Sequence, residues 1–200
     1  GDIRSQGFDL NGGWVPWYNL HKLFAGLIDA YRFCGNAKAL DVVSRMADWA
    51  EAVTRDLSEE QWQQMLACEH GGMNESLADL YGLTGDARYL AVAERFYHRA
   101  ILDPLSAGRD ELEGKHANTQ IPKVIGAARL FELTGEQPFA EISRFFWDTV
   151  TANHSYVTGG NSQGEHFGAP GKLNDRLAAN TTETCNTYNM LRLTRLLFCR

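Results

Sequence analysis

The residues of this sequence best suited to chemistry are a glutamate and a cysteine two positions apart, Glu183 and Cys185. They follow Thr181 and Thr182, either of which can cap a helix, so we expect both side chains in a first helical turn. There the helix dipole favours negative charge and lowers the pKa of a thiol. A carboxylate and a thiolate at this spacing can share one metal ion, and Zn²⁺ accepts both ligand types. Two ligands do not complete a site, and a capping glutamate beside a buried cysteine is the simpler interpretation.

A third candidate, Glu165, precedes Glu183 by eighteen residues. It is the only carboxylate in the glycine-rich segment 156–168, whose glycines permit a strained loop. A carboxyl group held in such a loop beside aromatic residues can have its pKa raised enough to act as an acid. The alternative is a solvated loop glutamate without a chemical role.

Three histidines each precede a predicted helix: His21, His70 and His116. Helix N-termini favour hydrogen bonding to oxygen-rich ligands. If the helices form a ring, their starts open at the same end, and the three imidazoles could converge there. A histidine that caps a helix or satisfies a turn is the alternative for each. His98, in contrast, is expected in the middle of a helix as a structural residue.

The elements that must position these residues are revealed by an internal repeat. Gly35, Gly85 and Gly135 are 50 residues apart, and each follows an apolar segment with helical periodicity. A glycine at that place ends a helix in the left-handed conformation. A second helix is expected after each glycine, over residues 39–52, 89–100 and 139–150. Each repeat is therefore predicted to be a helical hairpin.

We see no alternating run that predicts a strand, so the fold class is all-α. Helical hairpins can stack as an open solenoid or close as a toroid of two concentric rings. The segments that return to the next hairpin are long and rich in His, Gly, Asn and Trp, which favours a site at one end of a ring. These segments are residues 11–18, 69–74, 108–118 and 156–182. We therefore predict a partial (α/α)6 toroid in which residues 1–200 supply three hairpins and the start of a fourth, an incomplete catalytic domain.

Composition excludes some classes of partner. Nineteen Lys and Arg against 25 Asp and Glu give a formal charge of −6, and the basic residues are scattered. A nucleic-acid partner would need a basic patch. No apolar run approaches the roughly 18–20 residues that span a bilayer. A neutral glycan is the partner that fits this balance best.

The cysteines show no CxxC pair and no disulfide framework. Cys34 and Cys199 lie in apolar helical runs, so both are expected to be buried as small hydrophobic residues. Cys68 is ambiguous. Only Cys185 has neighbours that suggest chemistry.

At four places the chain resembles the β-L-arabinofuranosidases of glycoside hydrolase family 127 and the related family 146. The matching segments are Tyr18–Lys22, His116–Lys123, Tyr156–Glu165 and Glu183–Asn186. The resemblance implies an (α/α)6 toroid followed by β-sandwich domains. It also implies the removal of terminal β-L-arabinofuranose from plant-type or bacterial glycans, with retention of configuration.

The resemblance also implies roles for individual residues. Glu165 would be the acid/base, and Glu183 and Cys185 would be zinc ligands. The residues that would line the sugar subsite are His21, His70, His116 and Gln120. The nucleophile and the remaining cysteine ligand would lie beyond Arg200, and Cys199 is too close to Cys185 to replace them. We therefore expect these residues to form half of a site, and the chain alone to hydrolyse nothing.

Two alternatives remain open at this point. A metal-free unsaturated-uronide hydrolase or sugar epimerase of the same fold would use the histidines and Glu165 without zinc. A non-catalytic helical-repeat scaffold would use its loops to bind a glycan or a protein. Replacing Glu165 by Gln would leave the scaffold's function intact and would abolish turnover in either enzyme.

Overall fold

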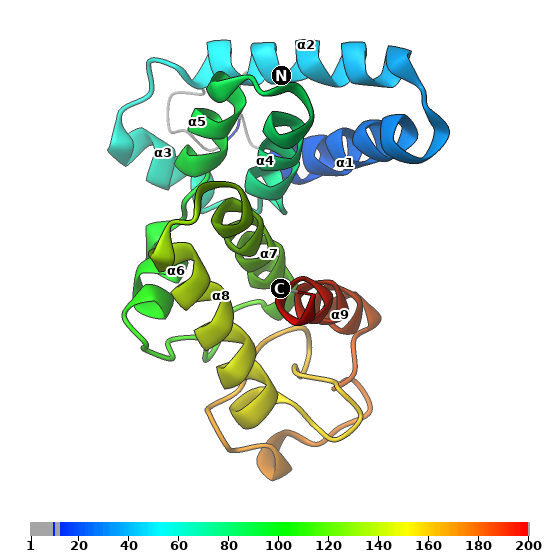
Figure 1. Cartoon of the computed structure of the whole chain (residues 1–200). Helices are drawn as coiled ribbons and strands as arrows, with labels where there is room; N and C mark the ends of the chain where they lie inside the picture. The colour runs from blue at the N-terminus through cyan, green and yellow to red at the C-terminus, as the bar shows by residue number, and fades with distance from the viewer. Residues whose placement is uncertain (1–9, 11–12, 200) are drawn as a thin grey trace. The chain divides into compact units, whose positions relative to one another are not determined.

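Helices make up all the regular structure in the computed structural model, which describes residue 10 and residues 13–199. The predicted all-α class is confirmed (Figure 1). The chain divides into two units, Gly1–His98 and Arg99–Arg200, which are described separately. The helices of the first unit are α1 (Pro16–Cys34), α2 (Ala37–Thr54), α3 (Glu59–Leu66), α4 (Met73–Thr84) and α5 (Ala87–Arg95). Those of the second are α6 (Arg99–Ser106), α7 (Ala117–Thr134), α8 (Gln137–Thr149) and α9 (Thr184–Phe198), with a π-helical turn at Val150–His154 and a 3-10 turn at Asn174–Arg176.

The predicted hairpins are α1–α2, α4–α5 and α7–α8, and the two helices of each pack against one another (Figure 1). Gly35, Gly85 and Gly135 end the first helix of each hairpin with φ values of 64°, 73° and 74°. These are left-handed conformations in which a side chain would be strained. The role predicted for the three repeated glycines is confirmed.

Short polar contacts stabilise the hairpin turns. Thr84 donates its hydroxyl hydrogen to the Leu80 carbonyl and accepts from the amide of Asp86. Thr134 makes the same two contacts, with Leu130 and Glu136. The repeated Thr-Gly pair therefore closes the second and third hairpins in the same way.

The helix predicted over residues 89–100 is interrupted, and this expectation was wrong. α5 ends at Arg95 and α6 begins at Arg99, so His98 lies in the break and not in the middle of a helix. Phe96 in the break is fully buried, and its ring packs edge-on against Trp17 at 5.1 Å and Trp62 at 5.0 Å. Burying this aromatic ring outweighs the helical preference of the segment.

The short helix α3 was not predicted, although its signal is present in the sequence. Ser58 caps it, and Gln61 accepts a hydrogen bond from the Ser58 amide, which completes a capping box. The helix buries Trp62, Met65 and Leu66. The expectation that Cys34 and Cys199 are buried is also wrong: both are exposed, Cys34 as the last residue of α1 and Cys199 as the C-cap residue of α9.

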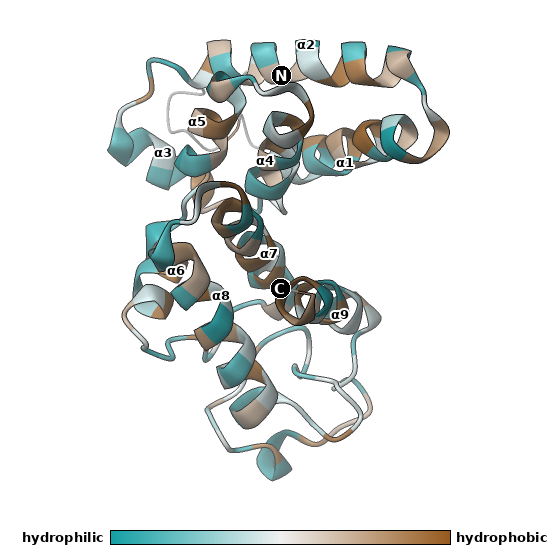
Figure 2. Ribbon diagram, viewed as in Figure 1, coloured by the Kyte–Doolittle hydropathy of each residue, from teal (hydrophilic) through white to brown (hydrophobic). Residues whose placement is uncertain are grey.

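Within each unit the hairpin helices also pack on further helices. α1 packs on α4 and α2 on α5 in the first unit, while α7 packs on α9 and α6 on α8 in the second. α7 is buried at nearly every position from Ala117 to Ala128, and its ribbon is largely hydrophobic in Figure 2. A helix that is buried on nearly all sides belongs in a protein interior, whereas α8 is amphipathic and buries one face.

Apolar side chains remain exposed on some helices. On α1 and α2 these include Leu23, Val42 and Trp49, and on α9 they are Tyr188, Leu191 and Phe198. Among the helices described, none is both long and apolar enough to cross a membrane. Closure of the hairpins into a toroid, and their number in the domain, stay predictions.

Candidate active site

Glu165 lies in a tight turn of the loop that joins the π-helical turn to α9. Gln163 and His166 close the turn with two backbone hydrogen bonds. The Gln163 amide donates to the His166 carbonyl at 3.0 Å, and the His166 amide donates to the Gln163 carbonyl at 3.2 Å. Both central residues have positive φ, 53° at Gly164 and 69° at Glu165. This is the backbone pattern of a type I′ turn. A left-handed conformation costs a residue with a side chain about 1–2 kcal/mol, so the structure holds Glu165 where a glycine would be more stable.

The segment before α7 compensates for this strain. The Glu165 carbonyl accepts a hydrogen bond of 2.8 Å from the Ala117 amide. Phe167 pairs with the same segment, accepting from the Gly114 amide at 3.0 Å and donating to the Lys115 carbonyl at 2.9 Å. The Glu165 turn is therefore fixed to the start of α7 by its backbone.

His116 orients the side chain of Glu165. Its Nε2 atom lies 3.2 Å from Oε2 of Glu165, whose side chain is 61% exposed. His116 is also the N-cap of α7, and its Nδ1 atom accepts a hydrogen bond from the Thr119 amide. A backbone N–H can only donate, so the neutral imidazole carries its proton on Nε2 and donates it to Glu165. The prediction that His116 precedes a helix is confirmed.

His166 flanks Glu165 on the other side. Its Nδ1 atom is 2.7 Å from the Gly164 carbonyl, and its ring packs edge-on against His116 at 5.4 Å. Sequence analysis gave His166 no role, because no helix follows it. Its position next to Glu165 in the chain was the available signal.

The second pair of candidates lies at the start of α9. Glu183 is the N-cap residue, but its side chain makes no capping hydrogen bond, and Cys185 lies in the first turn. Thr181 and Thr182 do not cap the helix as expected, because the helix begins later, and the Thr181 hydroxyl donates to the Ala178 carbonyl. The Glu183 carboxylate thus does not cap the helix that it begins.

Burial raises the pKa of the Cys185 thiol, and a hydrogen bond with Glu183 and the negative charges of Glu183 and Glu165 raise it further. The expectation that the helix dipole lowers this pKa is therefore wrong for the chain without a metal, since desolvation and the nearby carboxylates outweigh the dipole. Cys185 therefore lies within electrostatic reach of both carboxylates.

The donors at the start of α9 fit a metal ion in part. The Oε2 atom of Glu183 is buried and accepts no hydrogen bond from the described residues. A buried carboxylate oxygen without a partner is costly, and a divalent cation would supply one. The Cys185 thiol beside it is a ligand type that zinc prefers. Within residues 13–199 no group of three or more His, Cys, Asp or Glu side chains is placed to hold a metal, so these two donors alone do not make a metal site.

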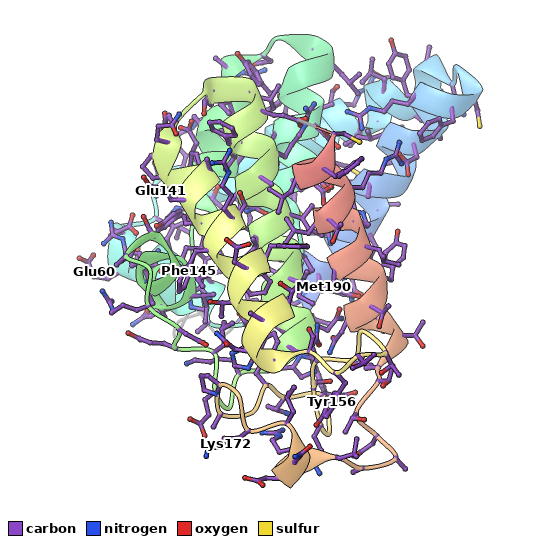
Figure 3. The ribbon with its side chains drawn as sticks, turned by 60° about the horizontal axis from the view of Figure 1, so that its bottom comes forward. Glu60, Glu141, Phe145, Tyr156, Lys172 and Met190 are labelled. Atoms are coloured by element: carbon purple, nitrogen blue, oxygen red, sulfur yellow. The ribbon has the colours of Figure 1, made fainter. Side chains whose placement is uncertain are left out.

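Buried asparagines connect α9 to the loop and to α7. Asn186 donates to Oδ1 of Asn161 and to Oγ of Ser162, both at 2.9 Å. Asn189, one turn later, donates to Oδ1 of Asn118 at 2.8 Å. These residues were not predicted from the sequence, although two asparagines three positions apart lie on one face of a helix. Figure 3 shows Met190 on the same helix and Tyr156 in the loop.

Gln120 is buried one turn after His116. Its amide nitrogen donates to the His116 carbonyl at 3.0 Å, and its amide oxygen accepts from Nζ of Lys123 at 2.9 Å. Both polar groups of the amide are thus engaged within α7. A contact between Gln120 and a sugar stays a prediction.

The other two candidate histidines lie in the first unit. His21 is inside α1 and does not precede it, because Pro16 starts the helix earlier than expected. Its Nδ1 atom accepts from the Gly72 amide at 3.1 Å, and His70 is fully buried with Nδ1 3.3 Å from the Cys68 carbonyl. Both imidazoles thus contact the loop before α4. Their convergence with His116 stays a prediction.

The described helices thus form hairpins, and the second unit carries a carboxylate in a strained turn and a Glu-x-Cys helix start. The chain belongs to the family described as β-L-arabinofuranosidase, GH127 catalytic domain, whose model matches residues 2–200. A search of curated proteins found no match to the chain. The resemblance read from four segments is confirmed at the level of the family.

Proposed function

We propose that this chain carries the acid/base and part of a zinc site of a retaining glycosidase that removes terminal L-arabinofuranose from glycans. One observation carries the proposal: Glu165 is held in a strained turn, oriented by His116, and within electrostatic reach of Cys185. Strained backbone at a polar residue is frequent at functional sites. The family match supports the glycosidase class.

A retaining glycosidase needs a nucleophile and a separate acid/base. Glu165 would give a proton to the leaving oxygen and later take one from the attacking water. His116 donates to Oε2, which holds the carboxyl plane in one orientation and leaves Oε1 directed elsewhere. The exposed side chain of Glu165 has access to a substrate.

Glu183 and Cys185 would hold the metal. Bound zinc would keep a coordinated thiol deprotonated near neutral pH. The nucleophile implied by the family resemblance is a further cysteine, and we assign no described residue to that role. The proposed sugar contacts are His21, His70, His116 and Gln120.

The test replaces Glu165 by Gln in the full-length protein and measures turnover of aryl β-L-arabinofuranosides. We expect kcat to fall by about 10²–10⁴, the usual contribution of a general acid/base. The loss should be smaller for aryl groups that depart without a proton. Glu141→Gln, an exposed glutamate on α8 labelled in Figure 3, is the charge-matched control. Full turnover in Glu165→Gln would refute the acid/base role of Glu165.

A further inference from the structure

Arg176 reaches back from the 3-10 turn Asn174–Arg176 to the loop that carries Glu165. Its Nη1 atom donates to the Phe167 carbonyl at 3.1 Å. Its Nη2 atom donates to the carbonyls of Gln163 and His166, at 3.2 and 2.9 Å. One guanidinium therefore binds carbonyls on both sides of Glu165.

A guanidinium is suited to this arrangement. It is planar, always charged, and presents its donors in a fixed fork, so it can bind several carbonyls without rearranging. Gln163 and His166 are also the residues whose backbone bonds close the turn. Arg176 thus acts on the part of the loop that determines the backbone conformation of Glu165.

Gly168 makes room for this side chain. A Cβ atom at Gly168 would lie 2.8 Å from both Nε and Nη1 of Arg176, and closer still to Cδ. The backbone of Gly168 does not have the positive φ that would itself require glycine. The missing side chain at Gly168 is therefore a matter of space for Arg176.

We propose that Arg176, admitted by Gly168, is a positioning residue for Glu165. It fixes the carbonyls of Gln163, His166 and Phe167, and so holds the turn that presents the Glu165 carboxyl. It does not touch the substrate. The inference rests on the proposed acid/base role of Glu165, and its predicted effect is on proton transfer.

The first experiment compares Arg176→Ala with Arg109→Met, an exposed arginine paired with Glu111, in the full-length enzyme. We expect Arg176→Ala to lower kcat by about tenfold or more with little change in KM. The reason is that the variant misplaces the Glu165 carboxyl and leaves the affinity for substrate unchanged. The loss should be largest for substrates whose leaving group needs a proton. Added guanidinium ion should restore part of the kcat of Arg176→Ala, and it should leave the kcat of Arg109→Met unchanged.

The second experiment uses Gly168→Ala, which keeps Arg176 but displaces it. If both residues act through one contact, the double variant should be no slower than Arg176→Ala alone. Hydrogen exchange should accelerate at the amides of residues 163–167 in each variant while α7 stays protected. This readout is independent of turnover.

Three results would overturn the proposal. The first is an unchanged kcat in Arg176→Ala, and the second is a fall in kcat that is the same for all leaving groups. The third is a fall in kcat in the double variant equal to the product of the falls in the two single variants. None of these results changes the turnover expected for Glu165→Gln. Active Glu165→Gln would instead remove the proposed function itself, whatever Arg176 does. The two failures are therefore distinguishable.

Discussion

The Nε2 atom of His116 and the Oε2 atom of Glu165 are 3.2 Å apart, although 49 residues separate them in the chain. The opposite nitrogen of the same imidazole caps α7 through the Thr119 amide. A single side chain therefore contributes to helix stability with one nitrogen and orients the proposed acid/base with the other. Substitutions at His116 can separate these contributions.

His116→Ala should remove both contacts. We expect the free energy of unfolding to fall by about 1 kcal/mol from the lost cap. His116→Asn should keep the stability close to that of the parent, because Asn is a good N-cap. Both variants should lower kcat by about tenfold, since neither donates to Glu165. Denaturant unfolding and steady-state kinetics check the two effects, and parental kcat in His116→Asn would contradict the orienting role.

The turn at Glu165 predicts an inverted order of stability between two truncations. Glu165→Ala and Glu165→Gly both remove the carboxylate, but only glycine is unstrained at a φ of 69°. We expect Glu165→Gly to be more stable than Glu165→Ala by about 1 kcal/mol. Thermal unfolding of the two proteins measures this difference. Equal stability, or a more stable alanine variant, would show that the residue is not left-handed in solution.

Replacing Glu183 by Gln should reduce bound zinc without harming the metal-free fold. Its buried Oε2 atom accepts no hydrogen bond in the described part of the chain, so the neutral amide costs little and removes a buried charge. Elemental analysis of the full-length protein should find less zinc than in the parent. A chelator should lower the melting temperature of the parent and leave that of Glu183→Gln nearly unchanged. Equal zinc content in both would refute the assignment.

Asn186 should stabilise the loop more than its size suggests. Asn186→Ala leaves the Asn161 and Ser162 oxygens without their shared donor in a buried place. We expect a loss of about 1–3 kcal/mol in the free energy of unfolding. Asn186→Asp, which has nearly the same shape but cannot donate, should lose at least as much. An Asn186→Asp variant with an unchanged free energy of unfolding would mean that the hydrogen bonds to Asn161 and Ser162 do not stabilise the fold.

Local rules predicted the hairpins well. Gly35, Gly85 and Gly135 end their helices in the left-handed conformation, which a local sequence signal is enough to predict. The break at Phe96 was not predictable, because it follows from packing against Trp17 and Trp62, residues distant in the sequence. Tertiary burial decided that segment.

The candidate site divides in the same way. Residue type and spacing singled out Glu165, Glu183 and Cys185, whose roles stay predictions. The contacts of His166, Arg176 and Asn186 depend on how the loop folds back, which no periodicity reveals. The pKa of the Cys185 thiol is raised and not lowered, because the helix dipole is outweighed by desolvation, by the neighbouring Glu183 and by Glu165, which only the fold brings near.

The repeated glycine turns have a practical consequence. α7 has 18 residues and so rises about 27 Å from His116 to Gly135. The exposed tip beyond Gly135 is thus a remote place for a covalent handle. A cysteine introduced at Glu136 could carry a dye or tether the protein to a surface, while the carboxylate turn at the opposite end of the helix stays open to sugar in the surrounding solution.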